Sequence, residues 1–271
     1  DSINSLEKFD ELLTEKLRAF SSRNIRKQII KNFIIRQTIR FWPFISRWAN
    51  ENDTQKYANE FNNSLYNQKT LADLSSNCRF IINATNLQTG CRFRFEKNDF
   101  GDYRTGYSYD TSFFLLGDAV AASGAFPGFF SPLRLTTENY VFYHRDETKA
   151  DKNKNVCVPA FIQLSDGGVY DNLGVEPLER ECVGSPNSFV VVSDAAQAFD
   201  DRFKDFSWLS SIYRSYLVTY NRNLNRVRQF VGQNLINKKW RGVYFNLGKS
   251  CRHYRNCPQN DSELQLQIPD H

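Results

Sequence analysis

Residues 158–174 read VPAFIQLSDGGVYDNLG, and this stretch decides our interpretation of the fold. The apolar run 158–164, with one polar residue inside it, has the length and composition of a buried strand, and it leads to Asp166 on a tight turn. In an open, mostly parallel α/β sheet, ligands bind beyond the carboxyl ends of the strands, so we expect Asp166 to point into that crevice. Gly167 and Gly168 have no Cβ atom, so a substrate could lie close to the main chain there. The alternative is that this Asp-Gly pair is only turn chemistry.

A second stretch upstream favours a functional reading. Residues 118–135 read DAVAASGAFPGFFSPLRL, which predicts a short helix of small residues over 118–122 followed by a Ser-Gly-Ala-Phe-Pro loop. Small side chains would let this helix lie close to a neighbouring strand. The aromatic residues after the loop could line an acyl-chain channel, although aromatic residues at this density are more often part of a core.

The two stretches together resemble the patatin-like phospholipase family. Its late motifs are a small-residue helix, an A-A-F-P type loop, and a strand that ends in D-G-G or D-G-A. Residues 83–90 (NATNLQTG) and 189–194 (FVVVSD) are similar to two further strands of that family, so the resemblance covers roughly residues 80–247. It implies a three-layer α/β/α patatin-like sheet, here incomplete, with an N-terminal helical segment.

The resemblance also implies a chemistry. The family hydrolyses lipid acyl esters, as phospholipase A or lysophospholipase, with a Ser-Asp dyad and no cofactor. Asp166 matches the aspartate that serves as general base, and Gly167 and Gly168 match the glycines that shape the substrate site. The expected partner is a phospholipid or another acyl lipid.

The nucleophile of the dyad does not match any serine in this chain. The family carries it in a Gly-x-Ser-x-Gly elbow on a sharp strand-to-helix turn. Ser123 comes nearest, but it has alanine at both glycine positions, and the glycine-rich oxyanion loop is also absent. The chain begins at Asp1 and contains no Met. We therefore expect a processed or truncated product whose missing N-terminal segment carries the nucleophile.

Composition limits the remaining classes of function. The chain has 271 residues, of which 41% are hydrophobic and 24% charged, and these values are typical of a folded protein. A net charge of +5 does not indicate nucleic-acid binding, and no stacking platform accompanies the basic residues. No run of about eighteen apolar residues and no signal peptide occurs, which predicts a soluble or peripheral membrane protein. The six cysteines contain no C-x-x-C pair, so we expect no metal site, and their even count is only weak evidence for disulfide bonds.

The N-terminal part is basic and apolar at once. From Lys16 to Asn50 there are nine basic residues and no acidic ones, and the segment from Arg23 to Trp48 interleaves them with aromatic and aliphatic residues. Such a helix could contact an anionic membrane surface. Because Arg36 lies among the apolar positions of the helical wheel, a core helix with solvated basic flanks is an equal alternative.

We expect one patatin-like domain over residues 1–271, with a helical segment (1–75), an α/β core (76–249) and a polar tail (250–271). Strands alternate with helices after residue 79, which is typical of an α/β fold. Further expectations are a polar, loop-bearing surface segment at 50–77, a hairpin formed by the strands 79–85 and 91–95, a loop at 98–110, a strand at 140–144, a helix at 175–181, a strand at 189–193, a long helix at 207–231 and a last strand at 243–247.

Two other acids compete with Asp166. Asp171 stands in a Tyr-Asp-Asn-Leu turn and is expected to make a local hydrogen bond, whereas Asp194 ends a strand as Asp166 does. Besides the lipid acyl hydrolase, the sequence leaves open a non-catalytic relative that acts as a partner, and a membrane-surface binding module.

Overall fold

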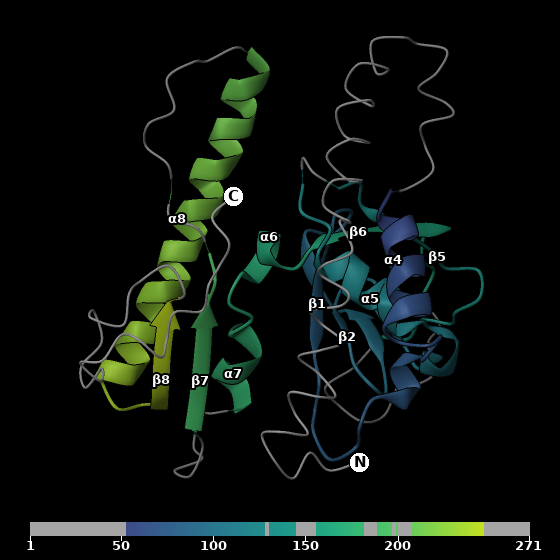
Figure 1. Cartoon of the computed structure of the whole chain (residues 1–271), viewed down its shortest axis with the longest axis horizontal. Coiled ribbons are helices and arrows are strands. Elements are labelled where there is room, and N and C mark those ends of the chain that lie inside the picture. The colour runs from purple at the N-terminus through teal and green to yellow at the C-terminus, as the bar shows by residue number, and fades with distance from the viewer. Residues whose placement is uncertain are drawn as a thin grey trace. The chain divides into compact units, whose positions relative to one another are not determined.

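The computed structural model describes residues 53–127, 130–144, 156–181, 189–196, 199 and 208–246. Within the chain, contacts define two compact units, residues 1–170 and 171–271, which are treated separately below. Figure 1 shows the described elements of both units, coloured along the chain. The predicted helical segment 1–75 is therefore described only from residue 53 onward, and the predicted tail 250–271 lies outside the described residues.

The first unit is built on a six-stranded sheet with the order β4-β3-β2-β1-β6-β5, in which each described pair of neighbours is antiparallel. Along the chain, the turn between the first two strands makes a hairpin, and a second hairpin joins the next two. The last two strands are added to the other side of the first, because β6 pairs with both β1 and β5. The strands are β1 (Ile82–Asn86), β2 (Cys91–Phe95), β3 (Phe100–Asp102), β4 (Gly106–Ser108), β5 (Leu133–Thr136) and β6 (Phe161–Asp166).

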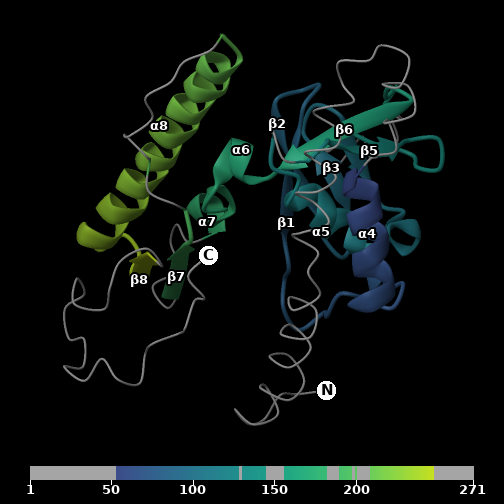
Figure 2. The same cartoon turned by 45° about the horizontal axis from the view of Figure 1, so that its top comes forward.

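One face of this sheet carries the core of the first unit. On β2 the residues alternate, so that Phe93 and Phe95 have no exposed surface while Arg92 and Arg94 lie on the other face. Helix α5 (Leu116–Ser123) contacts β1, β5 and β6, and helix α4 (Asp53–Ser64) packs on α5 (Figure 2). Short helical turns, η2 (Leu71–Asp73) and η3 (Thr111–Phe113), complete the described part of the unit, and α6 (Gly168–Asp171) spans the point where the two units divide.

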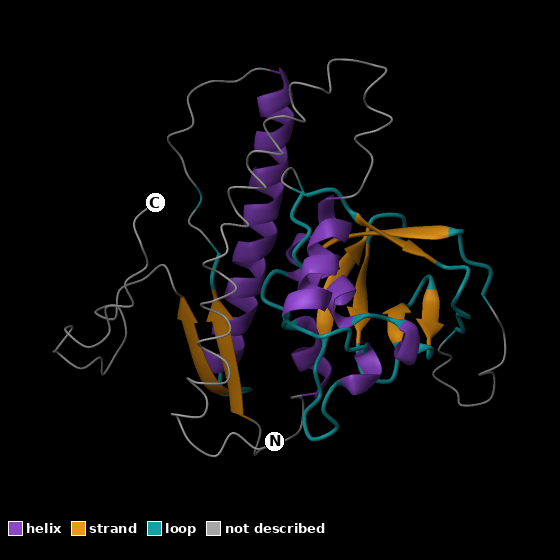
Figure 3. Cartoon of the chain, turned by 45° about the vertical axis from the view of Figure 1, so that its right-hand side comes forward, coloured by secondary structure: helices purple, strands orange, loops and turns teal. Residues whose placement is uncertain are grey.

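The second unit combines a long helix with a two-stranded sheet. Strands β7 (Phe189–Asp194) and β8 (Arg241–Asn246) run parallel, and α8 (Trp208–Ile236) connects them (Figure 3). Its core gathers valines of β7 with Val231 of α8 and Trp240, and α7 (Glu176–Glu181) contributes Leu178.

Most of the predicted elements are present. The fold class is α/β, as the sequence predicts. The small-residue helix is α5, the hairpin is β1–β2, and the later expectations correspond to α7, β7, α8 and β8. The parallel neighbour expected for strand 189–193 is β8.

Three local expectations and one global one are wrong. Residues 53–64 form helix α4 with buried positions, which agrees with a helical segment over 1–75 but not with a loop-bearing surface at 50–77. Residues 98–110 contain the β3–β4 hairpin, and residues 140–144 contain only an isolated bridge at Tyr143. The sheet that holds Asp166 is not mostly parallel, because β6 is antiparallel to both of its neighbours. Short connections such as the four-residue β1–β2 turn favour antiparallel pairing, whereas a parallel pair needs a long crossover.

Candidate active site

Asp166 ends β6, as the sequence predicts, and the main chain around it is held from two sides. Its N–H donates to the carbonyl of Ala125 over 3.0 Å, and the hydroxyl of Thr85 on β1 donates to its own carbonyl over 2.8 Å. The preceding residue, Ser165, is buried, and its hydroxyl donates to the same Ala125 carbonyl over 2.9 Å. The strand end is therefore fixed both by its sheet neighbour and by the loop that follows α5.

The turn after Asp166 is equally constrained. The N–H of Gly167 donates to the carbonyl of Ser123 over 3.3 Å. A Cβ atom added to Gly167 would lie 2.4 Å from the carbonyl oxygen of Asn83 on β1, closer than real Cβ contacts allow. Glycine is thus required at position 167 by the close approach of two backbones. The N–H of Gly168 donates to Oδ1 of Asp166 over 2.5 Å, which orients the carboxylate.

The Asp166 side chain is half-buried, and this burial raises the pKa of its carboxyl group; the hydrogen bond from Gly168 N–H opposes the rise without cancelling it. A raised pKa brings a carboxylate closer to the operating pH at which a general base works well. Gly167 and Gly168 lie beside it in the same turn, so the three predicted site residues form one local structure.

Asp171, the second acid, binds backbone N–H groups near its own turn. It is buried, and its carboxylate accepts the N–H of Gly174 over 3.1 Å and the N–H of Glu176 over 2.9 Å. These bonds confirm the predicted local hydrogen bonding and cap the start of α7.

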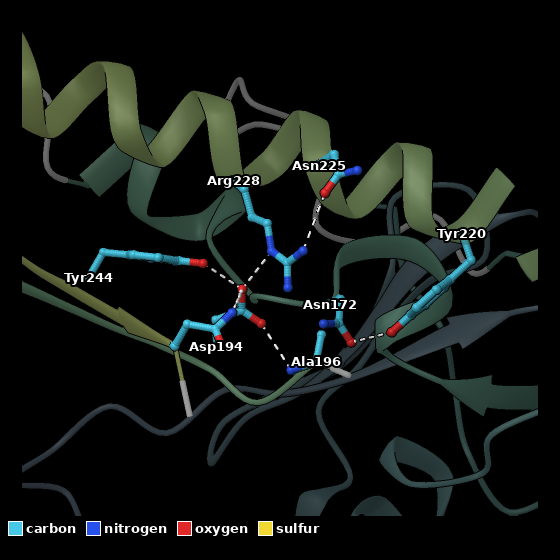
Figure 4. A network of polar contacts seen from close by, with 8 residues as sticks. Asn172, Asp194, Ala196, Tyr220, Asn225, Arg228 and Tyr244 are labelled. Carbon is cyan, nitrogen blue, oxygen red and sulfur yellow. Dashed lines mark hydrogen bonds and ion pairs between the residues drawn. The ribbon is translucent and has the colours of Figure 1, made fainter. Parts of the chain in front are cut away.

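Asp194, the third acid, has no exposed surface and is enclosed by donors within the second unit (Figure 4). Its Oδ2 accepts bonds from Arg228 Nε at 2.6 Å, from the Tyr244 hydroxyl at 2.5 Å and from Asn246 Nδ2 at 3.2 Å, and its Oδ1 accepts the N–H of Ala196 at 2.9 Å. Burial works against ionisation, but the hydrogen bonds from Arg228, Tyr244 and Ala196 outweigh it and lower the pKa of Asp194. A carboxylate saturated in this way is a poor proton acceptor.

Three further expectations concern metal binding, membrane spans and the basic N-terminal segment. Within the described ranges, no three His, Cys, Asp or Glu side chains converge closely enough to hold a metal ion. No helix among the described residues is long and apolar enough to cross a membrane. The segment from Arg23 to Trp48, for which membrane contact is predicted, lies outside the described residues.

A comparison with protein-family models matches residues 3–179 to the patatin-like phospholipase model. The chain belongs to the patatin-like phospholipase family. The match reaches further toward the N-terminus than the motifs suggest, since it includes the basic segment, and it ends soon after the Asp166 turn. No curated protein matches the chain. The match to the family model confirms the resemblance drawn from the two motifs.

In this patatin-like protein, Ser123 lies at the end of helix α5 and not on a strand-to-helix turn, so it does not have the setting of a nucleophile elbow. Sequence reasoning missed the residues that hold the turn. Ser165 and Thr85 lie inside the quoted stretches 158–174 and 83–90, but their bonds go to backbone carbonyls of Ala125 and Asp166, which the sequence alone does not indicate. The available signal is the small, polar character of these residues within strands.

Proposed function

We propose that this protein is a lipid acyl hydrolase of the phospholipase A or lysophospholipase type, in which Asp166 is the general base of a Ser-Asp dyad. The nucleophilic serine belongs, in this proposal, to sequence outside the 271 residues, because no Gly-x-Ser-x-Gly occurs among them. The observation that carries the proposal is the half-buried carboxylate at the end of β6. Its pKa is raised, two hydrogen bonds fix the backbone of Asp166, and a third orients the carboxylate.

The reaction then has two halves. The serine hydroxyl transfers its proton to Asp166 as its oxygen attacks the ester carbonyl, and the tetrahedral intermediate expels the alcohol part of the lipid, which takes the proton. Water then attacks the acyl-serine ester and gives its proton to Asp166, and Asp166 passes this proton to the serine oxygen as the bond to the fatty acid breaks. Asp166 ends each cycle ionised, and the glycines at 167 and 168 leave room for the substrate beside it.

The test is fatty-acid release from phospholipid vesicles by the complete protein and by its Asp166→Asn variant. Loss of a general base typically lowers the rate by about 10² to 10⁴. Asp110→Asn is the matched control, because Asp110 lies in the same unit and accepts the N–H of Val141 over 3.2 Å, away from the Asp166 turn. An Asp166→Asn variant as active as this control would overturn the proposal.

The same assay separates the alternatives. A non-catalytic relative would release no fatty acid in either form, whereas a hydrolase with another base would keep its activity in Asp166→Asn. Neither outcome is compatible with Asp166 as the dyad base.

A further inference from the structure

A single side-chain amide joins helix α4 to the beginning of helix α5. Asn62 is 1% exposed; its Oδ1 accepts the N–H of Gly117 over 2.8 Å and its Nδ2 donates to Oδ1 of Asp118 over 2.9 Å. A Cβ atom on Gly117 would lie 2.3 Å from Asn62 Oδ1 and 2.9 Å from the carbonyl oxygen of Ala58. Glycine at 117 therefore lets the two helices approach closely enough for both bonds to form.

Asp118 is an unusual partner for Asn62, because it is an acidic residue in the contact between helices α4 and α5. Its carboxylate accepts side-chain hydrogen bonds from Asn62 and Gln55 and forms no ion pair among the described residues, and burial raises its pKa. Burial, together with the nearby charges of Asp118 and Asp110, raises the pKa of Tyr140 to about 12, so this neighbouring phenol is neutral at physiological pH. A buried polar group held by neutral donors alone depends strongly on each of them.

The far end of α5 leads to the catalytic turn. The carbonyl of Ser123, the last residue of the helix, accepts the N–H of Gly167, and the carbonyl of Ala125 accepts both the N–H of Asp166 and the hydroxyl of Ser165. The eight residues of α5 span about 12 Å. Ala119 and Ala122 have no exposed surface, so the helix is held tightly along this length.

We propose that Asn62 and Asp118 are positioning residues for the acyl-transfer site: their amide–carboxylate pair fixes the position of α5, and α5 places the carbonyls that hold the Asp166 turn. The catalytic consequence rests on the proposed function, whereas the positioning itself does not. A small displacement of α5 changes the geometry of Asp166 because packed interiors transmit shifts instead of absorbing them.

The pair allows a swap experiment. Asn62→Asp keeps the acceptor for Gly117 N–H but places two carboxylates against each other, whereas Asp118→Asn keeps a neutral hydrogen bond to Asn62. The double variant Asn62→Asp/Asp118→Asn restores one amide and one carboxylate in exchanged positions, and both bonds to residue 62 can form again. Asn63→Asp is the matched control, since Asn63 is the next residue of α4, is exposed, and accepts a bond from Gln68 over 2.6 Å at the surface.

The decisive readout is amide hydrogen exchange of a peptide that covers residues 164–168, because Asp166 N–H and Gly167 N–H report the two tethers directly. We expect at least about tenfold faster exchange in Asn62→Asp, from the loss of a hydrogen bond to a charged group. We expect wild-type exchange in Asp118→Asn, the double variant and the Asn63→Asp control. In the complete protein, kcat falls in parallel while KM changes little.

Unchanged exchange in Asn62→Asp would overturn the inference, and so would a double variant whose turn still exchanges fast. If Asn62→Asp alone does not fold, the double variant decides, because the exchanged pair must then recover both the fold and slow exchange. A wild-type protein without hydrolase activity would refute the proposed function only, since the exchange experiment needs no turnover.

Discussion

Arg228 Nε lies 2.6 Å from Asp194 Oδ2, and the aspartate has no exposed surface while the arginine side chain keeps 24% of its own. The pair links the long helix α8 to the carboxyl end of strand β7 within the second unit (Figure 4). The strand end resembles that of Asp166 in sequence, but its surroundings are different. Asp166 has one backbone donor to its carboxylate, whereas Asp194 has a guanidinium, a phenol, a side-chain amide and a backbone N–H.

Arg228→Met should destabilise the second unit. Removal of one partner leaves a buried charge partly uncompensated, and such changes cost about 3 kcal/mol. Because Arg228 is partly exposed and Asp194 keeps three other donors, we expect the free energy of unfolding to fall by less than this amount. Urea unfolding followed through the fluorescence of buried Trp240 measures it, with the exposed Arg226→Met on the same helix as control. Equal midpoints for the two variants would show that the ion pair does not stabilise the unit.

Asp194 also makes the stability of the second unit depend on pH. Because its pKa is lowered in the folded state, its contribution is complete above the pKa of an unfolded aspartate, about 3.9, and is lost as the pH falls through the lower folded value. Asp194→Asn should therefore be less stable than the wild type at pH 7, and the difference should shrink below about pH 4. Urea midpoints at pH 7 and pH 3 measure this. A difference that is the same at both values would contradict the assigned shift.

The sequence allowed the Asp166 turn to be predicted because all its signals are local. An apolar run followed by an acid and two glycines places a strand end and a turn without any knowledge of neighbours. What it could not show is which strands lie beside β6, since Thr85 is 81 residues away along the chain. The direction of pairing depends on such distant partners, and this explains why a parallel sheet was expected around Asp166.

The buried face of helix α4 was not predicted, for a physical reason that also hid the amide of Asn62. The buried positions Thr54, Ala58 and Asn62 follow a spacing of four residues, but two of them are polar. Their polar atoms are satisfied by distant groups: Thr54 donates to the carbonyl of Ser131, and Asn62 bonds to residues of α5. A buried stripe with hydrogen-bonded polar residues shows no hydrophobic periodicity, so the segment resembled a loop-bearing surface.

Gly167→Ala should damage both fold and activity. The added methyl group would lie 2.4 Å from the carbonyl oxygen of Asn83, so β1 or the turn must move, at a cost of about 1 to 3 kcal/mol. Gly124→Ala is a fitting control in the neighbouring loop, because its nearest contact would be an ordinary 3.7 Å and its φ of −99° suits any residue. Thermal unfolding and fatty-acid release should separate the two variants. A Gly167→Ala protein that matches Gly124→Ala in both would mean that the turn tolerates a side chain.

The pH dependence of activity should report Asp166 directly. The base form of the dyad requires an ionised carboxylate, and burial raises the pKa of Asp166 above its ordinary value of about 3.9. As the pH falls through this raised pKa, the fraction of active base decreases, so the acid limb of kcat/KM should have its midpoint above pH 4. The complete protein and its Asp110→Asn control should share the limb. Thr85→Val, which removes the hydroxyl bond to the Asp166 carbonyl but leaves the carboxylate in place, should lower kcat while the midpoint stays close to that of the wild type. A limb centred at or below pH 4 would mean that the base is a solvated acid, which is incompatible with the half-buried carboxylate at the end of β6.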